Sequence, residues 1–265
     1  MLSAFSQFSN TVLTEHGTGG TRDLMNINYI CESKTGLVRE ANQDFADTLQ
    51  TGQGFLAVVC DGVGGNSGGE TASRVAVESI IEFFSANEDL DPTARLQMAV
   101  ESANARINEV ARHDSNLTGM ATTVVALYLD RVNAYWASAG DSRIYFYDDG
   151  DLYQITKDHS LVQQMIDDGL LSPQAAEKHP FRHVITRAIG ERVTIDVDGG
   201  SMPIEYKHNI KFLLCSDGVS GHLTADEIAR LLKNPDLNEI ELRLSQMVEE
   251  RGAHDNYTFI IISNK

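Results

Sequence analysis

The sequence has few cysteines, a shortage of basic residues and no long apolar run, and each of these excludes a class of protein. No run approaches the ~20 apolar residues of a membrane-spanning helix. The N-terminus shows neither the basic n-region nor the apolar h-region of a secretory signal. Cys31, Cys60 and Cys215 sit in or beside apolar stretches without CxxC spacing. We therefore expect small core residues, not a disulfide framework or a zinc site. We therefore predict that the protein lies in a reducing compartment, the cytoplasm.

Acidic residues outnumber basic ones, with 38 Asp and Glu against 21 Lys and Arg and a net charge of −17. This argues against nucleic acid or an anionic membrane as the main partner, since both require basic patches. The 265 residues, 42% of them hydrophobic, suffice for one large core. No repeat or linker divides residues 26–265, which we predict to be one domain. Residues 1–25, rich in Ser, Thr and Gly, are predicted to be a flexible N-terminal tail.

The apolar pattern predicts many strands between two pairs of helices. Tight turns join several strands into meanders, which favours antiparallel sheet. The simplest arrangement is an α+β fold: a four-layer α/β/β/α sandwich of two antiparallel sheets flanked by helices. Residues 160–190 form a small helical insert that we predict to be a flap. The predicted strands are 27–32, 55–60, 121–129, 133–139, 143–147, 152–155, 194–197, 211–215 and 257–263, and the predicted helices are 70–87, 91–113, 161–168, 172–177, 224–233 and 237–251.

Aspartates recur beside the core strands and suggest a convergent carboxylate cluster. Asp-Gly is also a common turn dipeptide, so a single case carries little weight. Several carboxylates in one place would raise each other's pKa values unless cations compensate them. Oxygen ligands without His or Cys suit Mg²⁺ or Mn²⁺ better than zinc, and a two-metal carboxylate site activates water and clamps a phosphoryl group. The aspartates are Asp44, Asp61, Asp141, Asp217 and Asp255.

A cation that binds phosphate should lie near such a cluster. Arg39, five residues before Asp44, is the best candidate, because a guanidinium forks onto phosphate oxygens. The alternative is a surface arginine that pairs with Glu40 or Asp44.

Six stretches, in chain order, resemble the metal-dependent protein phosphatases of the type 2C (PPM) family, and its bacterial branch most closely. One such motif is weak evidence, but all six in order are highly specific, and the resemblance spans roughly residues 26–263. The stretches are Arg39-Glu40-Ala41-Asn42-Gln43-Asp44, Val59-Cys60-Asp61-Gly62-Val63-Gly64-Gly65, Gly119-Met120-Ala121-Thr122-Thr123, Ala139-Gly140-Asp141-Ser142-Arg143, Cys215-Ser216-Asp217-Gly218 and Asp255-Asn256-Tyr257-Thr258. Residues 156–160 and 179–190 match the borders of the family's flap.

The resemblance implies a β-sandwich with metal ions in a cleft at one end. It implies hydrolysis of phosphoserine and phosphothreonine in proteins by a hydroxide that bridges two Mn²⁺ or Mg²⁺ ions, with no phosphoenzyme. It also implies the following roles: Asp61 bridges the two metals and the Gly62 carbonyl binds one, Asp217 and Asp255 hold the other, Asp44 orients metal-bound water, Asp141 with Asp217 serves a third, weaker metal near the flap, and Arg39 grips the substrate phosphate.

Two departures from the family pattern matter for mechanism. Val63 stands where many eukaryotic members carry a histidine proposed as the general acid, so the proton donor stays unassigned. Gln43 replaces a frequent glutamate and adds no charge. Ala121 stands where glycine is usual, a packing change with no functional consequence that we can name.

Two other functions stay open at this point. One is a phosphoprotein-binding pseudophosphatase or scaffold, which the complete set of candidate ligands disfavours. The other is a phosphatase of a small phosphorylated molecule, because the flap and not the metal site selects the substrate. The expected partners are phosphoprotein substrates of a Ser/Thr kinase, and we expect a monomer.

Overall fold

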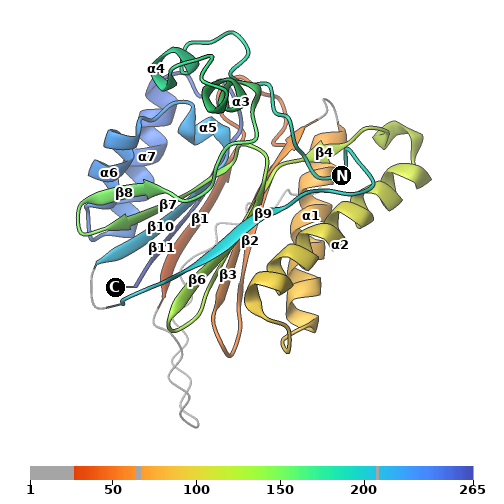
Figure 1. Ribbon diagram of the computed structural model, residues 1–265. Coiled ribbons are helices and arrows are strands. Elements are labelled where there is room, and N and C mark those ends of the chain that lie inside the picture. Colours follow the sequence, from red (N-terminus) through yellow and green to blue (C-terminus); the bar gives the residue numbers. More distant parts are fainter. Residues whose placement is uncertain (1–26, 64–66, 207–208, 265) are drawn as a thin grey trace, which may run out of the picture.

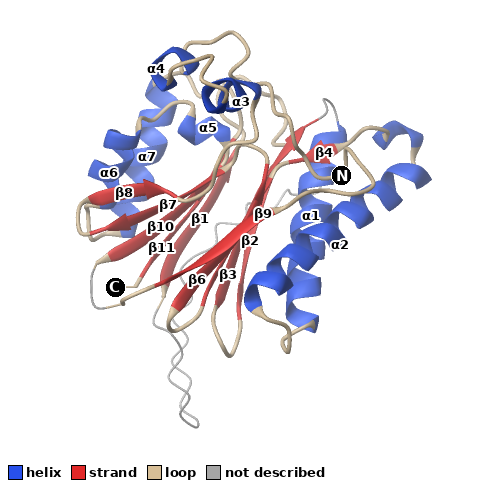
Figure 2. Ribbon diagram, in the orientation of Figure 1, coloured by secondary structure: helices blue, strands red, loops and turns tan. Residues whose placement is uncertain are grey.

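The computed structural model describes residues 27–63, 67–206 and 209–264, which form two antiparallel sheets packed face to face with helices on both outer faces (Figures 1 and 2). The predicted four-layer α+β sandwich is confirmed. The predicted tail, residues 1–25, lies outside the described residues, so the division into a tail and one domain stays a prediction. None of the described helices is long and apolar enough to cross a membrane.

The two sheets consist only of antiparallel pairs. The first sheet has the order β1-β11-β10-β7-β8, formed by Asn28–Lys34, Tyr257–Ser263, Ile210–Cys215, Arg143–Asp148 and Asp151–Gln154. The second has the order β2-β3-β5-β6-β9, formed by Asp44–Gln50, Phe55–Val63, Val124–Leu129, Asn133–Ala139 and Asp198–Pro203. The short strand β4 (Ala121–Thr122) pairs with the end of β3.

Each sheet is covered by its own pair of helices (Figure 1). Helices α1 (Ser67–Ala86) and α2 (Pro92–His113) cover the second sheet, followed by the 3-10 turn η1 (Ser115–Leu117). Helices α6 (Ala225–Leu232) and α7 (Leu237–Glu250) cover the first. The predicted caps are present: the Asp91 side chain accepts from the first turn of α2, and Thr224 and Glu227 form a capping box at α6.

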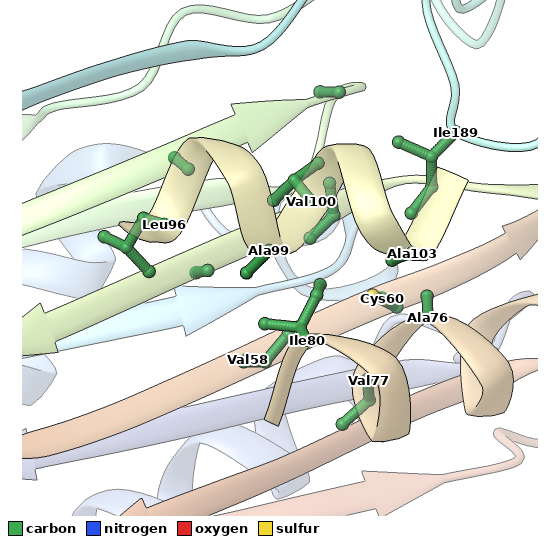
Figure 3. Packing of buried hydrophobic residues seen from close by; sticks show 14 of the residues in the cluster. Val58, Cys60, Ala76, Val77, Ile80, Leu96, Ala99, Val100, Ala103 and Ile189 are labelled. Atoms are coloured by element: carbon green, nitrogen blue, oxygen red, sulfur yellow. The ribbon is translucent and has the colours of Figure 1, made fainter. Parts of the chain in front are cut away.

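The apolar run of strand β3 is unbroken because both faces of this strand are buried. Because successive side chains point to opposite faces, alternate residues enter different layers. Phe55, Ala57 and Val59 pack between the two sheets, whereas Val58 and Cys60 pack against α1 and α2, as Figure 3 shows. A strand buried on both faces has no place for a charge until it reaches the end of the sandwich.

The predicted flap holds two short helices, α3 (Leu161–Asp167) and α4 (Pro173–Ala176), with turns between them. Its two ends are joined by an isolated bridge between Ser160 and Ile185. Figure 1 shows α3 and α4 at the end of the sandwich where α5 (Asp217–Ser220) lies. The flap therefore lies over one end of both sheets.

Four sequence predictions need correction. The strand predicted at 194–197 is wrong, since the edge strand is β9 (Asp198–Pro203), whose glycines and proline resemble a turn and which is defined only by pairing with β6. Strand β2 was missed, so Asp44 begins a strand instead of ending a stretch. Strand β3 extends past Cys60 to Val63, and helix α5 was also missed.

Candidate functional site

A cleft of about 700 Å³ opens at the flap end of the sandwich. Of the seven predicted site residues, six line it: Arg39, Asp61, Gly62, Asp141, Asp217 and Asp255. The seventh, Asp44, lies directly opposite Asp61 in the β2–β3 ladder, behind the cleft wall. Both sheets contribute, so residues more than 200 positions apart in the sequence meet at one place.

Asp44 and Asp61 are fixed by the strands that carry them. The Asp61 backbone N–H donates to Thr123 Oγ1 at 3.0 Å, and its carbonyl accepts from the Thr123 N–H at 2.8 Å. Asp44 is 5% exposed, and its Oδ2 accepts from Ser216 Oγ at 2.7 Å. The Ser216 hydroxyl oxygen also accepts from the Thr258 N–H at 3.0 Å, so this serine ties the second sheet to the first.

Gly62 occupies a position where only glycine fits. A Cβ atom there would lie 2.2 Å from the Gly69 carbonyl oxygen and 2.5 Å from the Gln43 carbonyl oxygen. The Gly62 N–H donates to the same Gln43 oxygen at 3.1 Å. Close backbone approach of this kind brings carbonyl groups to the rim of a cleft, where they can bind a cation.

Asp217 and Asp255 come from the first sheet but lie outside its strands. Asp217 follows β10 and begins α5, and Asp255 precedes β11. The next residue, Asn256, fixes the chain: its amide nitrogen donates to the Thr35 and Ala41 carbonyls at 2.8 and 2.9 Å. Its amide oxygen accepts from the Gln43 backbone N–H at 2.9 Å, just before β2 begins. The residue next to Asp255 is therefore tied to the segment 35–43 that leads into β2.

Asp141 sits on a tight turn after β6. Gly140 has φ +113°, and a Cβ there would lie 2.6 Å from the Thr123 side chain, so the turn requires glycine. Ser142 Oγ lies 2.7 Å from Thr123 Oγ1. Thr123 thus contacts both the backbone of Asp61 and the turn that carries Asp141.

The acidic cluster is electrostatically unfavourable without cations. Burial, reinforced by Asp217 and Asp255, raises the pKa of Asp44 to about 7, although its bond from Ser216 opposes the shift. Burial and the four neighbouring carboxylates raise the pKa of Asp61 well above its usual range. Burial, then repulsion from Asp217, raises the pKa of Asp141 to about 7. Such shifts are typical of functional sites where like charges are held together.

The donor set suits a hard divalent cation. The cleft offers carboxylate oxygens and a backbone carbonyl, the ligands that Mg²⁺ and Mn²⁺ prefer. Within the described ranges no three Asp, Glu, His or Cys side chains already surround one point. Positive charge introduced among Asp61, Asp217 and Asp255 would relieve the repulsion between them.

Arg39 lies at the mouth of the cleft. Its Nη2 donates to Asp255 Oδ2 at 2.7 Å, so it pairs with neither Glu40 nor Asp44. The two side chains are 50% and 40% exposed. An exposed ion pair contributes little stability, so the guanidinium is free to exchange this carboxylate for phosphate oxygens.

The lining residues that were not predicted as site residues include two arginines and three histidines: Arg182, His183, His222, Arg251 and His254. His183 comes from the flap, and its Nδ1 lies 3.7 Å from Asp217 Oδ2, which raises the pKa of this histidine. His222 Nδ1 donates to the Gly218 carbonyl at 2.7 Å. No local pattern marks these residues, because they reach the cleft from three separate places: the flap, the turn after α5, and the segment between α7 and β11.

Comparison with known proteins identifies the family. The Protein phosphatase 2C family matches residues 38–256. The serine/threonine protein phosphatase PstP of Mycobacterium tuberculosis is 32% identical over 235 residues, which cover 89% of this chain and 44% of that protein. A putative protein phosphatase 2C-type of Streptococcus pyogenes is 30% identical over 236 residues, covering 87% and 94%. The chain belongs to the protein phosphatase 2C family, and it spans less than half the length of PstP.

Solved structures of related phosphatases have the same fold as this chain. A crystal structure of M. tuberculosis PstP superposes with a TM-score of 0.82 at 30% identity, covering 89% of this chain and 98% of that one. The catalytic domain of PstP in complex with two manganese ions superposes with a TM-score of 0.78 at 29% identity, covering 89% and 97%. The fold and the family predicted from the sequence are therefore confirmed.

Proposed function

We propose that this protein is a metal-dependent phosphatase that hydrolyses phosphoserine and phosphothreonine in proteins. The observation that carries the proposal is the convergence of Asp61, Asp217 and Asp255 from two sheets in one cleft, with Arg39 at its mouth. Membership of the protein phosphatase 2C family supports the same activity.

The residues present fit two divalent cations, which we propose to be Mn²⁺ or Mg²⁺. Asp61 and the Gly62 carbonyl would hold one, and Asp61 with Asp217 and Asp255 the other. Asp141 and Asp217 would hold a third, weaker ion. The manganese bound by PstP supports this metal. Such ions supply a nucleophile from water at neutral pH and stabilise charge on a phosphoryl group.

The protein's own residues orient the reactants. Asp44 lies opposite Asp61 in the ladder, and Ser216 fixes its Oδ2 atom; a carboxylate held in this way would orient water bound at the site. Arg39 binds the phosphate oxygens after it releases Asp255. Val63 cannot donate a proton, so the group that protonates the leaving oxygen is not among the residues assigned here.

Several further properties belong to the proposal. Phosphoproteins made by a Ser/Thr kinase would be the substrates, the protein would act in signalling as a monomer, and it would lie in the cytoplasm. The free state of Cys31, Cys60 and Cys215 supports a reducing compartment.

A phosphate-release assay with phosphothreonine peptides tests the proposal. Purified protein should release phosphate with Mn²⁺ and stop when a chelator is added. Release that is unaffected by the chelator, or absent at every Mn²⁺ concentration, would refute it. Peptide binding without release would instead indicate a pseudophosphatase, and preference for small phosphate esters over peptides would indicate the third function.

A further inference from the structure

A buried histidine outside the metal-binding cleft joins the flap to the turn that carries Asp141. His159 is 8% exposed and does not line the cleft. The Gly140 N–H donates to His159 Nδ1 at 3.0 Å, and the His159 N–H donates to the Gly140 carbonyl at 2.9 Å. One residue thus holds Gly140 through both of its backbone polar groups.

The Gly140 contact assigns the tautomer of the ring. Because Gly140 N–H is a donor, Nδ1 must be unprotonated, and the proton lies on Nε2. Nε2 is 3.1 Å from Asp198 Oδ2, which accepts this proton in a hydrogen bond. Arg187 Nη1 donates to Asp198 Oδ1 at 2.5 Å and lies 3.0 Å from His159 Nε2; in this tautomer both nitrogens are donors, and the Asp198 carboxylate accepts from each of them. The ring is neutral because its Nδ1 accepts, and burial and the Arg187 charge lower the pKa of His159 although Asp198 opposes this.

The same residue contacts the C-terminal end of the flap. The Thr186 N–H donates to the His159 carbonyl at 2.8 Å, next to the bridge between Ser160 and Ile185. Arg187, which contacts the His159 ring, is the next residue after Thr186 in the chain. The turn itself has little room to move, because Gly140 packs against Thr123. A shift of residues 185–187 therefore reaches Gly140 through His159.

We propose that His159 is a positioning residue that fixes the Gly140–Asp141 turn against the base of the flap and so sets how Asp141 faces the cleft. The role of Asp141 in holding the weak metal ion rests on the proposed function. The contact between His159 and Gly140 does not.

Two amide substitutions separate the two ring nitrogens. His159→Asn places an amide oxygen where Nδ1 lies and keeps an acceptor for Gly140, whereas His159→Gln places its amide where Nε2 lies and leaves Gly140 unpaired. In metal-free protein, hydrogen exchange of the Gly140 amide should be about tenfold faster in His159→Gln and near wild type in His159→Asn. In a calorimetric Mn²⁺ titration, His159→Gln should weaken only the weakest site, by about tenfold.

His113→Gln, at the exposed end of α2, is the matched control and should change neither readout. Nitrogen-15 NMR of the wild-type protein should show His159 Nδ1 without a proton. Equal exchange of Gly140 in both His159 variants, or a protonated Nδ1, would overturn the proposal. If both variants fail to fold, the wild-type ring signal decides. A wild-type protein without phosphatase activity would refute the proposed function and leave these tests unaffected.

Discussion

The two sheets present their carboxylates to the cleft in different ways. The second sheet holds Asp44 and Asp61 inside strands β2 and β3, where they face each other across a ladder. The first sheet holds Asp217 and Asp255 just outside β10 and β11, at a helix start and in a loop. Asp44 is 5% exposed, whereas the Asp255 side chain is 40% exposed. Ladder-held charges cannot move apart, but loop-held charges can turn toward solvent or a partner.

Because its carboxylates are buried and held in strands, the second sheet carries most of the unfavourable electrostatic energy of the site. Burial is the largest cause of the raised pKa values of both Asp44 and Asp61. Asp255 instead has the Arg39 guanidinium as a partner in the absence of metal. The second sheet thus holds the buried carboxylates that bound cations would stabilise most, while the first sheet, under the proposed function, would provide ligands that can adjust their positions.

Substitution of the metal-site aspartates should have the largest effect, and it should change catalytic activity and thermal stability in different ways. Asp61→Asn and Asp217→Asn should each lower kcat/KM by more than about 100-fold, since even partners of metal ligands cost ~10–100-fold. Only Asp61→Asn should raise the Tm of metal-free protein, because it removes a ladder-held charge. Asp226→Asn, exposed in the first turn of α6, is the control. Equal Tm changes in the two cleft variants would break the comparison between the sheets.

Arg39→Ala should have the next largest effect. A hydrogen bond to a charged group contributes ~1.5–3 kcal/mol, so kcat/KM for phosphopeptides should fall by about 10–100-fold. Steady-state kinetics measure this, with Arg106→Ala on the exposed face of α2 as the control. Unchanged kinetics would mean that Arg39 only neutralises Asp255.

The stability of metal-free protein should depend on pH through Asp44. Its pKa rises from ~3.9 in the unfolded chain to about 7 in the folded protein, so the folded state is favoured while the carboxyl is protonated. Stability should therefore decline as pH rises from about 4 to above 7, by roughly 4 kcal/mol, since each pKa unit corresponds to about 1.4 kcal/mol. Urea unfolding at several pH values measures the decline, and Asp44→Asn should reduce it. A stability that rises over this interval would contradict the assignment.

Ser216→Ala should have the smallest effect. It removes the hydroxyl that donates to Asp44 and accepts from the Thr258 N–H, and buried groups left unpaired cost ~1–3 kcal/mol. We expect a loss of about 1 kcal/mol in the free energy of unfolding at pH 5 and more at pH 8, where Asp44 is charged. Ser85→Ala, on the exposed surface of α1, controls for loss of a hydroxyl. An equal loss at both pH values would show that Ser216 does not stabilise the carboxylate.

The sandwich could be predicted because its signals are local. Phe55–Cys60 is apolar without interruption, and Asp91-Pro92 and Thr224 mark helix starts. Strand β9 could not be predicted, because Gly199 and Gly200 form a strand only against Trp136 and its neighbours in β6. Its position depends on long-range pairing and not on propensity.

The site shows the same division. The aspartates could be predicted because each lies at or next to a strand end, and their convergence follows from stacking two sheets. The partner of Arg39 could not, since Asp255 is 216 residues away. His159 and His183 were seen only as parts of the flap border, because their contacts depend on how the flap folds back over the cleft.

A crystal structure of the protein grown with Mn²⁺, with anomalous scattering collected at the manganese edge, is the most direct test that the cleft carboxylates form a metal site. We predict anomalous peaks in the cleft, within coordination distance of Asp61, Asp217 and Asp255, and an Arg39 side chain released from Asp255. A cleft without peaks at saturating Mn²⁺, with the Arg39–Asp255 ion pair intact, would contradict it.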